Sequence, residues 1–250
     1  MFDCARHRSG RVSSNSILCF AFDAYSRNKN SIFLHYDFFS RHGIRRELGN
    51  GTLSITARLV HLAKERNIPV LAAGGIVDGK GLVAALSLGA DGVVLGTRLW
   101  ASKEAKGPSP YKDAIARTKS CDEVVRTRVF DIINNSQRQT KWPYPFDSSG
   151  TLRNETTDAW DTSIAQLEAA LEADKLLSDE KTTTKELSIV EKLNHAEENE
   201  IPSKGVVYCG QGVGEIHSID SVSDIMQQME QDAIESLSNL KRIMPAIGVE

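Results

Sequence analysis

Two pairs of very small residues stand at the ends of two neighbouring apolar segments. Gly74-Gly75 follows IPVLAA, and Gly96-Thr97 follows GVVL, so that 22 positions separate Gly74 from Gly96. Because glycine has no Cβ, its backbone N–H group can come close to a phosphate, and Thr97 can add a hydroxyl donor. If both segments are parallel strands of a (β/α)8 barrel, their ends can bind one phosphate group together. We therefore predict a phosphate site at these four residues; tight strand-to-helix turns without a ligand are the alternative.

The elements around these glycines follow a strand–helix–strand–helix order, which indicates a parallel βαβ unit. Continuous apolarity in IPVLAA and in GVVLG is typical of parallel strands that are buried on both faces. Asp78 is suited to the N-cap of a helix from Gly79 to Leu88, with Gly89 just past its end. Ser102 could cap a further helix from about 103 to 116. A helix is also expected before the first strand, with an apolar stripe made of Leu53, Ile55, Leu59, Val60 and Leu62.

The remaining segments are less regular. A strand-like run lies at Ser31–Phe39, and a turn-rich aromatic stretch occupies 141–160. Residues 163–200 are strongly charged, which favours a solvated helix or a linker. Val206–Ile216 reads as a strand that passes into a glycine-rich loop. The last part predicts a helix packed on its own core, with one apolar face made of Val222, Ile225, Met226, Met229, Ala233, Leu237 and Leu240.

Composition excludes several classes of function. The chain has 250 residues, a formal net charge of -3, 40% hydrophobic and 25% charged residues, so we expect neither nucleic acid nor a membrane as partner. The four cysteines are widely spaced without a Cys-x-x-Cys pair. This spacing disfavours a metal site or a disulfide framework and fits a reducing, cytoplasmic compartment.

Three stretches resemble the nitronate monooxygenase family, formerly called 2-nitropropane dioxygenases. The most specific is Ile68–Ala105, and WPYPFDSSGTLRNETTDAW and VVYCGQGVGEI resemble the family's downstream segments in order. The resemblance covers roughly residues 42–240 and implies a TIM-barrel-type (β/α)8 α/β fold that binds FMN. It implies oxidation of a nitronate or nitroalkane with O₂, and a homo-oligomer is possible.

The resemblance also assigns residues to roles. Gly74, Gly75, Gly96 and Thr97 would bind the FMN phosphate, and Gln211 in the CGQG stretch would approach the flavin. The family's catalytic base is a histidine in a Gly-Gly-His-Gly segment, which His42-Gly43 match, whereas Ser40-Arg41 replace the first two glycines. An imidazole suits a base because its pKa lies near neutral pH.

The family also carries further βα units before this point, so we expect only the C-terminal part of the barrel, followed by helical segments. Residues 1–40 would form an atypical, poorly ordered leader, 41–120 the βα units with the phosphate site, and 121–250 an extension with a charged helical segment and a terminal amphipathic helix. Two other functions stay open. One is a non-catalytic fragment that binds a phosphate ligand or another subunit. The other is a barrel oxidoreductase like inosine monophosphate dehydrogenase, which the absence of cysteine between Cys19 and Cys121 disfavours.

Overall fold

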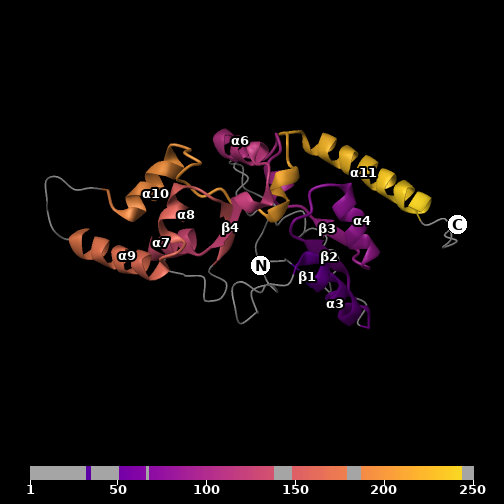
Figure 1. Cartoon of the computed structure of the whole chain (residues 1–250), viewed down its shortest axis with the longest axis horizontal. Helices are drawn as coiled ribbons and strands as arrows, with labels where there is room; N and C mark the ends of the chain where they lie inside the picture. Colours follow the sequence, from indigo (N-terminus) through magenta and orange to yellow (C-terminus); the bar gives the residue numbers. More distant parts are fainter. Residues whose placement is uncertain (1–31, 35–50, 66–67, 138–147, 179–186, 244–250) are drawn as a thin grey trace, which may run out of the picture. The chain divides into compact units, whose positions relative to one another are not determined.

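The computed structural model describes residues 32–34, 51–65, 68–137, 148–178 and 187–243. The chain divides into two compact units (Figure 1). Unit 1 comprises residues 1–107 together with 218–250, and unit 2 comprises residues 108–217. Most of the expected leader and His42 lie outside the described residues.

Unit 1 is built on a parallel sheet of three strands in the order β1 (Ile32–Leu34), β2 (Val70–Ala73), β3 (Gly92–Val94). The two predicted parallel strands are confirmed. Asp91 aligns their amino ends, because its carboxylate accepts a hydrogen bond from Val70 N at 2.7 Å and its backbone N–H donates to Val70 O at 2.8 Å. β1 falls within the strand-like run at Ser31–Phe39.

Helices α3 (Thr52–Lys64) and α4 (Gly79–Ser87) cover one face of this sheet. Val70 packs with Ala63 of α3, and Ala72, two residues further along β2, packs with Ala85 of α4. Because side chains two residues apart in a strand share a face, both helices lie on the same side. The predicted cap is confirmed, since the Asp78 carboxylate accepts from Gly81 N at 2.9 Å.

The predicted apolar stripe of α3 is wrong in part. Leu53 and Leu62 are each 54% exposed, whereas Thr56 and Ala63 are buried. Close packing against the sheet and α4 favours small side chains on the inner face, so the large leucines at the edges of the stripe remain outside.

The chain after β3 also differs from the prediction. A single turn, α5 (Thr97–Trp100), follows the strand, and the next helix, α6 (Ser109–Arg117), begins only after Pro108. Ser102 therefore does not cap a helix from 103. Instead it forms an isolated parallel bridge with Asp220, and Lys103 N donates to Asp220 O at 2.9 Å. Pairing with a distant segment replaces the local helix at this point.

Helix α11 (Val222–Ile243) lies along α4 (Figure 1). Ile225 and Met229 are buried, and Met229 joins the core cluster of Ala72 and Ala85. The helix is confirmed, but its predicted apolar face is only partly covered, because Met226 is 51% and Leu237 is 50% exposed. As predicted, the buried part of this face packs on a core of the protein itself, the cluster formed by β2 and α4.

Unit 2 combines an antiparallel pair, β4 (Val124–Thr127) with β5 (Ser149–Leu152), and a helical cluster. The helices are α7 (Val129–Gln137), α8 (Glu155–Trp160), α9 (Ile164–Ser178) and α10 (Ile189–Glu198), with 3-10 turns η2 (Cys121–Glu123) and η3 (Gln211–Glu215). A single core joins α7, α9 and α10 through Val129, Phe130, Ile133, Leu167, Leu171 and Leu193.

The predictions for this unit are confirmed only in part. The described part of 141–160, residues 148–160, contains β5 and α8. Residues 163–200 include two helices, which is one of the two expected alternatives, but these helices bury leucines in a core and are not wholly solvated. Val206–Ile216 gives an isolated antiparallel bridge at Tyr208 followed by η3, instead of a strand. Leucines spaced among charges supply enough apolar surface for the helices to pack.

The α/β class is confirmed, and across the described ranges the parallel sheet is open and does not close into a barrel. None of the helices in these ranges has the length and apolar character that crossing a membrane requires.

Candidate functional site

The predicted glycine ends meet at one edge of the sheet in unit 1. Ala73 pairs with Val94 in the parallel register, so β2 and β3 end level with one another. Gly74 and Gly75 leave the first strand with φ values of 115° and 70°, which L side chains rarely adopt. The Thr52 hydroxyl at the start of α3 donates to Gly74 O at 2.9 Å and fixes this turn.

The space above Gly75 and Gly96 distinguishes them from most other glycines of unit 1. A Cβ placed on either residue would meet no atom of the described residues within 4 Å. By contrast, a Cβ on Gly79 would collide with the α11 backbone at Met229 and Ala233, and one on Gly89 would lie 2.8 Å from Val60 Cγ1. Packing therefore explains Gly79 and Gly89 but does not explain Gly75 or Gly96.

Gly96 is the more informative of the two open positions. Gly75 needs glycine for its backbone conformation, whereas Gly96 has a negative φ of -94° that other residues can also adopt. Neither packing nor a positive φ therefore accounts for the missing side chain at Gly96. The open space at Gly96 leaves room for a ligand, as it also does at Gly75.

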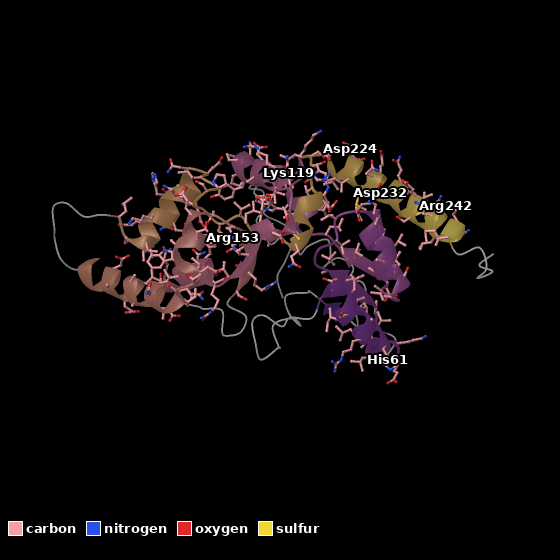
Figure 2. All side chains as sticks on the ribbon, in the orientation of Figure 1. His61, Lys119, Arg153, Asp224, Asp232 and Arg242 are labelled. Atoms are coloured by element: carbon pink, nitrogen blue, oxygen red, sulfur yellow. The ribbon has the colours of Figure 1, made fainter. Side chains whose placement is uncertain are left out.

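The other two predicted site residues are not brought to this edge by anything the structure describes. His42 lies outside the described residues. Gln211 begins η3 in unit 2, where its side chain is exposed and Val213 in the same turn is buried. Among the described histidines, His61 on α3 (Figure 2), His195 and His217 are all exposed.

The sequence analysis missed a partly buried ion pair formed by a residue two positions after Gly96. Arg98 of α5 has a side chain only 12% exposed, and its two terminal nitrogens donate to Ser218 O and to Asp220 Oδ2, each at 2.7 Å. The Ser218 hydroxyl donates to the same Asp220 oxygen. These hydrogen bonds, from Ser218 first and then Arg98, hold the pKa of Asp220 below its usual value. The sequence held one signal for this ion pair, the charged Arg98 inside the apolar LGTRLWA stretch. The pair could not be predicted from it, because the partner Asp220 is 122 positions away.

A separate cavity of about 380 Å³ lies in unit 2 between α6, β5 and α8. Its rim carries the exposed ion pair of Arg153 and Asp158, 2.9 Å apart. It includes none of the predicted site residues.

A parallel βα sheet whose strands end level with one another in open glycines defines an α/β protein. More specifically, the chain belongs to the nitronate monooxygenase family, whose model matches residues 42–232.

Individual relatives agree with this family. The nitronate monooxygenase npaC of Metarhizium robertsii is 33% identical over 195 residues, which are 77% of this chain and 48% of that protein. The chain thus spans about half the length of this relative. Among solved structures, FabK from Thermotoga maritima is similar with a TM-score of 0.58 at 23% identity, over 93% of this chain and 62% of that one. Nitroalkane oxidase from Streptomyces ansochromogenes gives 0.55 at 22%, over 80% and 49%.

Proposed function

We propose that Gly74, Gly75, Gly96 and Thr97 bind the phosphate group of FMN, and that the protein acts in the FMN-dependent oxidation of nitronates or nitroalkanes by O₂. The observation that carries this proposal is the open space above Gly96, where neither a protein atom nor a positive φ accounts for glycine. We call the space at the ends of β2 and β3, next to Gly74, Gly75, Gly96 and Thr97, the phosphate cradle. A Cβ on Gly96 would fill part of this space, so these residues fit a ligand that needs close approach to the backbone. Family membership supports a flavin as that ligand.

The chain's own residues have distinct tasks in this proposal. The backbone N–H groups of the glycine ends donate to phosphate oxygens, and the Thr97 hydroxyl adds a further donor. The fixed turn at Gly74, held by Thr52, presents these donors without reorganisation. When bound, FMN supplies the electron transfer between the nitronate and O₂.

Binding of two flavins tests the phosphate cradle. Riboflavin lacks the phosphate, so the chain should bind FMN more tightly than riboflavin in a fluorescence-quenching titration. Gly96→Val should remove most of this preference, because its side chain occupies the phosphate position. Ser87→Val is the matched control, since it adds the same side chain at an exposed position of α4. Equal affinities for FMN and riboflavin in the unaltered chain would refute the cradle.

We also propose that His42 removes the α-proton from a neutral nitroalkane. A nitronate has already lost this proton, so its oxidation needs the base less. In an active preparation, His42→Asn should therefore lower turnover of a nitroalkane far more than turnover of the corresponding nitronate. Equal losses on the two substrates would indicate that His42 is not the base.

Gln211 is proposed to approach the flavin ring rather than the phosphate. Gln211→Ala should therefore change the absorption spectrum of bound flavin while it leaves the preference for FMN over riboflavin intact. An unchanged spectrum would remove Gln211 from the site.

A further inference from the structure

The turn that carries Gly96 and Thr97 is too short to hold its own position. α5 comprises four residues, its hydrogen bonds run from Trp100 N to Gly96 O at 2.9 Å and from Ala101 N to Thr97 O at 3.0 Å, and no side chain caps it. A single helical turn is unstable in isolation, because it fixes several residues for few hydrogen bonds. The position of the Gly96 end must therefore depend on contacts with another segment.

Arg98 supplies such a contact two residues after Gly96. Its guanidinium binds two acceptors of one short segment, the carbonyl of Ser218 and the carboxylate of Asp220. Two charge-assisted hydrogen bonds from one planar group fix orientation as well as distance. A cation this little exposed would be costly without its partner, so the pair stays formed as long as the unit is folded.

The segment around Asp220 is itself held on several sides. Lys103 N donates to Asp220 O at 2.9 Å, and Val222 N donates to the Glu104 carboxylate at 3.0 Å. From Val222 the chain continues into α11, whose Met229 and Ala233 backbone atoms lie against Gly79 at the start of α4. Segment 218–233 thus contacts the helix that follows each glycine end, α5 after Gly96 and α4 after Gly75.

We propose that Asp220 is a positioning residue for phosphate binding: by holding Arg98 it fixes the Gly96–Thr97 end of β3 level with Gly74–Gly75. Asp220 does not touch the ligand in this arrangement and acts only through Arg98. The inference rests on the proposed FMN site. In this arrangement segment 218–233, more than 120 positions after Gly96, sets the geometry of the cradle.

The test compares FMN with riboflavin in Asp220→Asn and Arg98→Lys. Asp220→Asn keeps the shape of the side chain but loses its charge, and Arg98→Lys keeps the charge but cannot reach both acceptors with a planar group. We expect Asp220→Asn to weaken FMN binding about tenfold, which corresponds to about 1.4 kcal/mol, and to leave riboflavin binding unchanged. Arg98→Lys should give a smaller loss for FMN alone. Asp113→Asn, which removes the exposed pair with Arg117 at 3.7 Å, is the control and should change neither affinity.

The outcomes separate this inference from the proposed function. If a folded Asp220→Asn variant keeps the full preference for FMN, the positioning role is wrong while the proposed cradle stands. If it loses affinity for both flavins equally, Asp220 has only a general structural role, which also refutes the inference. If the unaltered chain shows no preference for FMN, the cradle fails and the inference fails with it. Should Asp220→Asn not fold, as judged by circular dichroism and thermal melting, Arg98→Lys decides the question by the same comparison.

Discussion

Gly96 at the sheet edge of unit 1 and Gly205 in unit 2 have opposite surroundings. A Cβ on Gly205 would overlap the Tyr111 hydroxyl and lie 3.1 Å from Ile201 O, and one on Gly150 in the same unit would lie 2.6 Å from Cys209 O. Within the part of the chain that the structure describes, a Cβ on Gly96 would have no atom within 4 Å. Glycine in unit 2 is thus required by neighbours inside the protein, whereas at the sheet edge it leaves room that the protein does not use. This difference separates glycines that packing explains from a glycine that we propose serves a ligand.

The largest effect on stability is expected at Gly79, where an added Cβ would come closer to backbone atoms than at the other described glycines of unit 1. Gly79→Ala would force α11 away from α4, because the clashing atoms belong to the α11 backbone and cannot rotate aside. Overpacking of this kind costs about 1–3 kcal/mol in the free energy of unfolding. The measurement is urea unfolding followed by circular dichroism. An unchanged midpoint would mean that α11 does not pack on α4 as described, and would remove the support for a cradle set by segment 218–233.

A smaller effect is expected at Gly205, where the clash involves a side chain. Gly205→Ala should destabilise unit 2, because the added methyl overlaps the hydroxyl of the buried Tyr111. The same substitution in a Tyr111→Phe background should cost less, since that hydroxyl is then absent. A double-mutant cycle measures this coupling, which we expect at about 0.5–3 kcal/mol. Additive effects would show that Tyr111 does not fill the space at Gly205. Flavin affinity should stay unchanged throughout.

The sequence predicts what is local and misses what depends on distant partners. The apolar runs of β2 and β3, the Asp78 cap and the small residues at the strand ends all depend on neighbours within a few positions, and each of these elements is confirmed. The helix expected from Ser102 fails because Ser102 pairs with Asp220, 118 positions further along. The burial of Arg98 was not predicted from the sequence for the same reason, since its partner Asp220 is 122 positions away. No period in the sequence connects residues so far apart.

The same distinction applies to unit 2. Residues 163–200 read as solvated because their charges outnumber their leucines, yet Leu167, Leu171 and Leu193 are nearly completely buried. Only the packing of α9 and α10 on α7 reveals that these leucines share one core. The antiparallel pair of β4 and β5 was missed because its strands are short and of mixed polarity, with Arg126 exposed and Thr127 buried.

The smallest effect on stability is expected for Gly96→Ala. Its comparison with Gly75→Ala tests most directly whether the space above Gly96 is free. Gly96→Ala adds a methyl group where the protein is open and φ is -94°, so the free energy of unfolding should stay within about 0.5 kcal/mol of the unaltered chain. Gly75→Ala meets equally open space but must adopt a φ of 70°, which costs about 1–2 kcal/mol. Thermal melts of the two variants without flavin therefore separate the conformational reason for a glycine from the spatial one. If Gly96→Ala melts as early as Gly75→Ala, a part of the protein occupies the space above Gly96 and the room assigned to the phosphate does not exist. If it melts like the unaltered chain but binds FMN more weakly, the missing side chain at Gly96 serves the ligand and not the fold.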